Sequence, residues 1–335
     1  VEWFRHQQHI IDCIKAEVKM LEKLRPDRVL GIFRFTLKAS AQIAGIPYDS
    51  LTCGCMTPDS EEVLGFAGNE PGMEQQRIIL EGFYRYAGAK LSDAYGSFSV
   101  NGVSHVLSAL KGELTFLWDF PEFAPLPRGN GSIHIGPFSW NRWPYDDIDV
   151  DSIADGKRLA IVAFGTCVSQ SGPARRIIPL LLDLGYRVLI AAGGQKDVLC
   201  DMPLSKNVVT STYAPLHKLF SHASLVISHG GQMTVFEALQ NKIPVIVMPF
   251  QPEQAHNGVC LERIGCGSRL VPSRPFQGNP SVYIDALLSM TDDEIKSKIS
   301  SLVENPDTPK RLEEIKKVMD RYEGVQKLVT MIEAA

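Results

Sequence analysis

The chain has 335 residues, of which 44% are apolar and 21% charged, and its net charge is −4. This balance is typical of a globular protein, and the length allows two domains with a core each. The mildly acidic, evenly spread charge argues against a nucleic-acid partner, and no apolar run approaches the roughly 18–20 residues of a membrane span.

Apolar residues in the first half recur with helical and strand-like periods in turn. The pattern predicts helices at residues 3–24, 37–44, 73–94 and 103–110, and strands at residues 29–33, 48–53, 114–118 and 133–138. The stretch from Pro58 to Pro71 is polar and contains glycine, so we expect a mobile loop there.

Residues 144–157 contain Pro144 and an Asp-rich run with little apolar periodicity, which indicates a linker. The chain beyond it alternates regularly. Strands are predicted at residues 159–164, 187–192, 207–212, 225–228 and 245–248, and helices at residues 173–184, 216–222, 234–240 and 254–264. Such alternation predicts an α/β fold with a parallel sheet, in which ligands bind beyond the carboxyl ends of the strands.

The strongest candidate site follows the strand that ends at residue 228. His229 is followed by Gly230 and Gly231, and Thr234 stands near the start of the next helix. Two glycines let a ligand approach the backbone, and a helix N-terminus offers free N–H groups that suit a phosphate. His229 is expected to donate a hydrogen bond to a phosphate oxygen. The alternative is a tight strand–helix turn capped by the Thr.

Three other strands also end in residues suited to ligand contacts. Thr166 lies in a turn of small residues that is able to present N–H groups to an anion. Tyr213 can stack on a planar base, and Glu253 and Gln254 suit sugar hydroxyls. The alternatives are an ordinary loop at Thr166, a core aromatic at Tyr213, and a helix-start carboxylate at Glu253.

The seven cysteines are odd in number and irregular in spacing, so a disulfide framework is not expected. Cys53 and Cys55 stand close together, but no second Cys/His cluster of zinc type accompanies them. We therefore expect reduced thiols, no metal site and a cytoplasmic location.

Residues 213–267 resemble the donor-binding signature of the UDP-glycosyltransferase superfamily, in particular its bacterial macrolide-type branch. The spaced elements that agree are Tyr-Ala-Pro-Leu, Leu-Val-Ile-Ser-His-Gly-Gly, Glu237-Ala-Leu, Ile-Pro-Val, Met-Pro, Glu253-Gln254, Asn257 and Gly265-Cys-Gly. In the first half, Leu24–Asp27, Ala44–Pro47 and Ile135–Phe138 agree more loosely with the same family.

The resemblance implies a GT-B architecture, with two Rossmann-like domains facing across a cleft. The first would cover residues 1–143 as a partial acceptor-side domain, the second residues 158–305 as the nucleotide-sugar domain. Residues 306–335 would form a C-terminal helix that returns toward the first domain. The chain is expected to begin partway into the family's first domain, so that the general base precedes Val1 and the catalytic residue is unknown. His6 and His9 are interpreted as surface or structural residues.

The resemblance also implies roles for single residues. The donor base would stack on Tyr213 and contact the backbone of Ala214, Thr166 would bind a phosphate, and Glu237 would accept from the ribose hydroxyls. His229 and the turn behind it would contact the diphosphate, and Glu253 and Gln254 would hold the transferred sugar. Three residues depart from the common family pattern: Leu216 in place of Gln, Met233 in place of Asn or Gly, and Glu253 in place of Asp.

The function expected is transfer of a hexose-type sugar from a UDP- or TDP-sugar to an acceptor hydroxyl by direct displacement. The acceptor would be a small molecule, a lipid or a glycan, and no metal or cofactor is expected. Two alternatives stay open at this point: a nucleotide-sugar epimerase on the same architecture, and a non-catalytic module that binds a nucleotide or a partner.

Overall fold

The computed structural model describes residues 2–138, 145–146, 148–149, 153, 156, 158–165, 171–195, 197 and 205–335. Its packing divides the chain into two compact units. The first comprises Val1–Glu62, Met73–Pro137 and Tyr322–Ala335, and the second Val63–Gly72 and Phe138–Arg321. The linker at residues 144–157 stays a prediction, because most of these residues lie outside the described part of the chain.

The first unit is built on a four-stranded parallel sheet in the order β1-β2-β3-β4. Its strands are β1 Val29–Ile32, β2 Tyr48–Thr52, β3 Thr115–Leu117 and β4 Ser132–His134. Its helices are α1 Glu2–Arg5, α2 Gln7–Leu24, α3 Leu37–Ala44, α4 Met73–Gly96 and α13 Val325–Glu333, with short 3-10 helices η1 Gly54–Met56 and η2 Val106–Leu110. The sheet and most helices confirm the sequence prediction. The first predicted helix is in fact two, because the chain leaves the helical conformation at His6 (φ −105°, ψ 88°).

The second unit contains a six-stranded parallel sheet in the order β10-β9-β8-β5-β6-β7. Its strands are β5 Leu159–Ala163, β6 Arg187–Ala191, β7 Val208–Ser211, β8 Ala223–Ser228, β9 Val245–Val247 and β10 Gly267–Arg269. The strand order reverses between β5 and β8, which are neighbours in the sheet. In doubly wound sheets the crevice beyond the carboxyl ends at this reversal is the usual ligand site.

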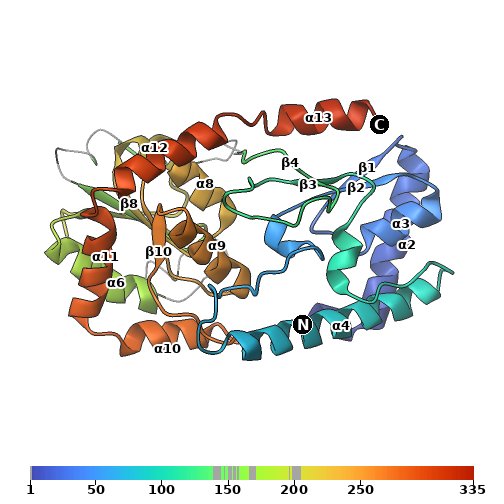
Figure 1. The fold of residues 1–335 in the computed structure, drawn as a ribbon, viewed down its shortest axis with the longest axis horizontal. Coiled ribbons are helices and arrows are strands. Elements are labelled where there is room, and N and C mark those ends of the chain that lie inside the picture. The colour runs from blue at the N-terminus through green and yellow to red at the C-terminus, as the bar shows by residue number, and fades with distance from the viewer. Residues whose placement is uncertain are drawn as a thin grey trace. The chain divides into compact units, whose positions relative to one another are not determined.

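Helices cover both faces of this sheet. They are α6 Gly172–Asp183, α7 Leu216–Leu219 with η4 Phe220–His222, α8 Gln232–Gln240, α9 Pro252–Arg263, α10 Ser281–Ser289, α11 Asp292–Val303 and α12 Thr308–Met319. In Figure 1, α6 and α11 lie on one side of β8 and β10, and α8 and α9 on the other. Because both faces are covered, the central strands β5, β8 and β9 are apolar almost throughout, as the sequence indicated.

Strand β10 was not predicted, because its sequence Gly-Ser-Arg is short and polar. A Cβ on Gly267 would lie 2.3 Å from the carbonyl oxygen of Val245, its partner in β9. Only glycine therefore lets this strand pair at the sheet edge. The strand brings Arg269 into the fold.

Two further expectations were wrong. The single C-terminal helix is two helices, α12 in the second unit and α13 in the first, separated by residues 320–324 with Gly324 at φ 55°. Residues 63–72, expected within a mobile loop, are instead packed as part of the second unit, with Val63, Leu64 and Phe66 buried. Among the described helices, none combines the length and apolarity needed to cross a membrane.

Candidate functional site

His229 stands at the reversal of strand order, directly after β8. Its imidazole lies between two glycines. A Cβ on Gly165, which follows β5, would lie 2.7 Å from Cε1 of His229, and a Cβ on Gly231 would lie 2.4 Å from Nε2. The ring thus occupies space that only glycine leaves free, and the two strand ends hold it in place.

The protonation of His229 follows from its surroundings. Burial lowers the pKa of the imidazole, and a weak hydrogen bond from Nδ1 to the carbonyl oxygen of Ala163, over 3.4 Å, opposes this in part. A carbonyl oxygen only accepts, so this contact assigns the proton of the neutral ring to Nδ1. Nε2 is then an acceptor, and it becomes a donor when the ring takes up a second proton.

The turn behind His229 opens the N-terminus of α8. Gly230 has φ 90°, and a Cβ there would lie 2.6 Å from the carbonyl oxygen of Gln254, so the backbone passes close to α9. The helix N-cap is Gly231, which provides no side-chain cap. The alternative of a Thr-capped turn is therefore wrong, because Thr234 lies inside the first turn. The N–H groups of this first turn have no capping side chain, which is the arrangement that binds anions.

Asn257 joins the predicted phosphate turn to the predicted sugar site, a role that sequence reasoning did not anticipate. Its Nδ2 donates to the carbonyl oxygen of Gly230 and to Oε1 of Glu253, over 2.8 Å each. The residue is 1% exposed. Glu253 stands in the first turn of α9, and this bridge fixes its carboxylate relative to the turn at Gly230.

Two carboxyl groups in this region have strongly perturbed acidity. Burial raises the pKa of Glu253 to about 7, although the hydrogen bond from Asn257 lowers it in part. Burial also raises the pKa of Glu237, on α8, to about 7. Within the described residues no side chain or backbone group donates to the Glu237 carboxyl. Half-buried carboxyl groups of this kind are typical of sites where a ligand supplies the missing donors.

The structure modifies the predicted role of Gln254. Its side-chain Oε1 accepts a hydrogen bond from the backbone N–H of Phe250 over 2.9 Å, and the residue is buried. The amide oxygen therefore shapes the turn between β9 and α9, and the amide nitrogen is left to donate to a sugar hydroxyl.

Tyr213 follows β7 and its side chain is 45% exposed, so the alternative of a core aromatic is wrong. Its hydroxyl lies over Gly194, where a Cβ would come within 2.4 Å. A Cβ on the neighbouring Gly193 would lie 2.5 Å from the carbonyl oxygen of Gly165. These two glycines after β6 were missed, because a Gly-Gly pair after a strand reads as an ordinary turn. Together with Gly165, these two glycines form a row of close contacts that runs from Tyr213 to His229.

The backbone of Tyr213 is held by a residue from the predicted linker. Oδ2 of Asp146 accepts from the N–H of Tyr213 over 3.0 Å and from Oγ of Ser211 over 2.7 Å. Ala214 is buried, and its carbonyl oxygen accepts from the N–H of Leu216. Thr166 lies outside the described residues, so its phosphate contact stays a prediction. Met233 is 45% exposed.

Comparison with known proteins agrees with this geometry. Residues 177–272 match the family model of the glycosyltransferase family 28 C-terminal domain. The chain is 25% identical over 279 residues to a "PGL/p-HBAD biosynthesis rhamnosyltransferase" of Mycobacterium bovis, a match that covers 78% of this chain and 60% of the relative. It is 28% identical over 149 residues to the "demethyllactenocin mycarosyltransferase" of Streptomyces fradiae, covering 44% of this chain and 32% of the relative.

Solved structures show the same fold. A glycotransferase of kitacinnamycin superimposes with a TM-score of 0.71 at 15% identity, over 98% of this chain and 80% of the other. Spinosyn rhamnosyltransferase complexed with thymidine diphosphate also gives 0.71 at 15% identity, over 99% and 80% of the two chains. The chain spans about 60% of the length of the mycobacterial relative. The chain thus has a GT-B fold and is similar to bacterial glycosyltransferases of the macrolide type, and its residues 177–272 match the C-terminal domain of glycosyltransferase family 28.

Proposed function

We propose that this protein transfers a hexose-type sugar from a UDP- or TDP-sugar to an acceptor hydroxyl. The observation that carries the proposal is the position of His229. Its ring lies between Gly165 and Gly231 at the strand reversal, beside the uncapped N-terminus of α8. This arrangement suits a diphosphate, and relatives of the chain are named as sugar transferases.

The proposed mechanism is a direct displacement at the anomeric carbon. The acceptor oxygen bonds to that carbon, the bond to the diphosphate oxygen breaks, and the acceptor proton passes to a base. The N–H groups of α8 and a protonated His229 stabilise the negative charge that develops on the leaving diphosphate. In this proposal the helix N-terminus takes the place of a cation, so that no metal or cofactor is required.

Each half of the donor has its own contacts in the proposal. Tyr213 stacks on the base, Glu237 accepts from the ribose hydroxyls, and Glu253 with the amide nitrogen of Gln254 holds the sugar. Thr166 contacts a phosphate. The acceptor is a small molecule, a lipid or a glycan, and we propose a cytoplasmic location because the odd number and irregular spacing of the seven cysteines do not indicate a disulfide framework.

Titration of the 335-residue chain with TDP and UDP by calorimetry is the direct test. We expect micromolar binding that Glu237→Ala weakens by about 1–3 kcal/mol, for free diphosphate and intact donor alike. Glu253→Ala should leave the affinity for free diphosphate intact and weaken only the donor. Binding of neither diphosphate would overturn the proposal. Conversion of a donor to its epimer without acceptor would favour the epimerase, and donor binding with no transfer to any acceptor hydroxyl would favour a non-catalytic module.

A further inference from the structure

Residues 63–72 come from the first half of the sequence but pack as part of the second unit. Their burial is unequal along the segment. Val63, Leu64 and Phe66 are buried, whereas Gly68 and Pro71 are more exposed. A short segment with three buried apolar side chains and no helix or strand of its own needs polar contacts to define its path.

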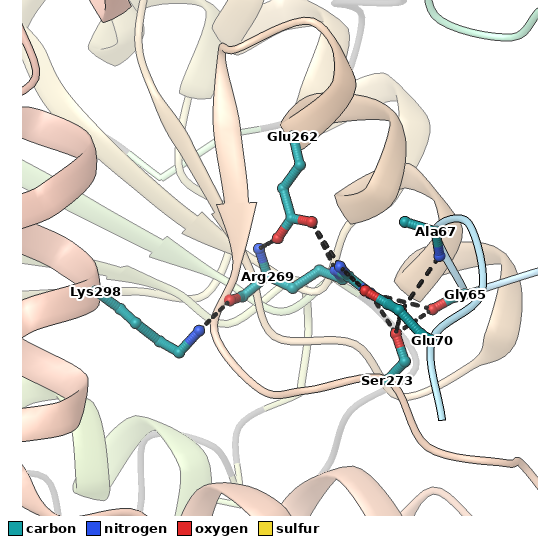
Figure 2. A network of polar contacts seen from close by, with 7 residues as sticks. All are labelled: Gly65, Ala67, Glu70, Glu262, Arg269, Ser273 and Lys298. Atoms are coloured by element: carbon teal, nitrogen blue, oxygen red, sulfur yellow. Dashed lines mark hydrogen bonds and ion pairs between the residues drawn. The ribbon is translucent and has the colours of Figure 1, made fainter. Parts of the chain in front are cut away.

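An arginine on the last strand provides those contacts. Arg269 of β10 forms a bidentate ion pair with Glu70, Nη1 to Oε2 over 2.9 Å and Nη2 to Oε1 over 2.7 Å. Oγ of Ser273 lies 2.6 Å from both Oε2 of Glu70 and the carbonyl oxygen of Gly65, and these two acceptors share its single proton. Figure 2 shows these groups converging on the segment from the second half of the chain. We call Arg269, Glu70 and Ser273 the clamp.

The clamp is itself held in place from α9. Nε of Arg269 donates to Oε2 of Glu262 over 3.0 Å, and the backbone N–H of Arg269 donates to Oε1 over 2.8 Å. Gly258 leaves room for the arginine stem, because a Cβ there would lie 2.5 Å from Cγ. The guanidinium is therefore fixed from both sides, by Glu262 and by Glu70 (Figure 2).

The clamped segment meets α9 at the helix start. A Cβ on Gly65, at φ 86°, would lie 3.1 Å from Cβ of Ala255 and 3.6 Å from the carbonyl oxygen of Pro252. Pro252 and Ala255 stand on either side of Glu253 and Gln254 in the sequence. The same helix thus carries the predicted sugar contacts in its first turn and Glu262, the anchor of the clamp, in its last.

Stability alone is a weak reason for such an arrangement. Removing charges from water costs much of what their attraction returns, so a half-buried ion pair contributes little net stability but enforces a single geometry. The hydrogen bonds from Arg269 lower the pKa of Glu70 to about 2, so the pair remains charged at every working pH. The clamp is a permanent positioning device rather than a switch.

We propose that residues 63–72 form one wall of the subsite for the transferred sugar, and that Arg269, Glu70 and Ser273 are positioning residues that set sugar selectivity through it. The proposal rests on the proposed function, because it assumes that Glu253 faces the sugar. Gly65 sets how closely the wall approaches the first turn of α9. The clamp touches neither His229 nor Tyr213, so its loss leaves the diphosphate and base contacts in place.

The test compares the affinity for intact donors with the affinity for free diphosphates. Glu70→Gln in the full chain replaces the bidentate ion pair with an uncharged partner, and Gly65→Ala pushes the segment away from α9 while keeping every charged group of the clamp. UDP, TDP and a panel of their glucose, galactose and rhamnose conjugates are titrated by calorimetry. For both variants we expect unchanged affinity for the free diphosphates, within two-fold, and a loss of about ten-fold in discrimination among the sugars.

A matched control is Asp292→Asn, which removes the exposed carboxylate that pairs with Arg176 on the far helices α6 and α11. Asp292→Asn should leave both the affinity for free diphosphates and the discrimination among sugars unchanged. Arg269→Lys should show the same loss of sugar selectivity, because an ammonium cannot form the bidentate pair. Unchanged sugar ranking in both Glu70→Gln and Gly65→Ala would overturn the proposal, as would an equal loss of affinity for diphosphates and donors. Absence of diphosphate binding in the unaltered chain would instead overturn the proposed function.

Discussion

Asn257 lies one helical turn after Glu253 on α9, and its Nδ2 donates to Oε1 of that carboxyl group over 2.8 Å. The second hydrogen of the same amide bonds the carbonyl oxygen of Gly230. We expect Asn257→Leu, which keeps the volume but removes both donors, to lower the free energy of unfolding by about 2 kcal/mol, because two half-buried acceptors lose their partner. Urea denaturation measures the change. Gln240→Leu removes an exposed amide bonded to Asp320 and should cost far less. An equal loss of unfolding free energy in both variants would contradict the bridge that Asn257 forms between Gly230 and Glu253.

The packing of His229 against Gly165 is tested by substituting two glycines, one beside the imidazole and one far from it. Gly165→Ala should displace the imidazole and weaken diphosphate binding about ten-fold, the loss of roughly one charged hydrogen bond. Gly185→Ala is the matched control, because Gly185 has a similar φ (80° against 69°) but no atom within 4 Å of its added Cβ. Both variants bear the strain of a left-handed residue, so only the difference between them reports on His229. Equal affinity for TDP in the two variants would show that the packing of His229 against Gly165 has no part in binding.

Binding should become tighter as the pH falls. Burial lowers the pKa of His229 below its ordinary 6.5, and a bound diphosphate raises it again, so binding takes up a proton in the window between the two values. We therefore expect the affinity for TDP to rise from pH 8 to pH 5.5, more steeply than in His229→Gln. Because His229→Gln lacks the imidazole, its pH dependence reports the titration of the ligand alone. Calorimetry in buffers of different ionisation enthalpy counts the protons, and identical uptake by the two proteins would exclude His229 as the phosphate donor.

Folding stability should depend on Glu253 in the opposite sense to an ion-paired carboxylate. Its pKa is raised from 4.5 to about 7, so between these values the folded chain holds the proton more tightly than the unfolded chain does. The free energy of unfolding then falls as the pH rises through this window, by at most about 1.4 kcal/mol per pH unit for one proton. Glu253→Gln keeps an acceptor for Asn257 and should flatten this part of the curve. Glu237→Gln should remove a second, separate contribution. A slope unaltered by Glu253→Gln would place its pKa near the ordinary value.

The elements that the sequence predicted well are those with a local signal. Apolar runs such as Leu159–Ala163 are strands because both of their faces are covered. The features that it did not predict depend on distant contacts. Gly267 makes a strand only because it pairs with Val245, and Asn257 becomes a bridge only where Gly230 reaches α9. No pattern within a few residues of either position carries that information.

The segment at residues 63–72 shows that the second unit is not continuous along the chain. Glu70 and Arg269 are separated by 199 residues, so a growing polypeptide contains the segment long before the strand that receives it. Until β10 is complete, Val63, Leu64 and Phe66 lack their final packing partners and are open to premature association. The contact also closes a very long loop, which belongs among the slow, late steps of folding. A fragment that begins at residue 158 would lack the segment altogether, and Arg269 would lose Glu70 as a counter-charge.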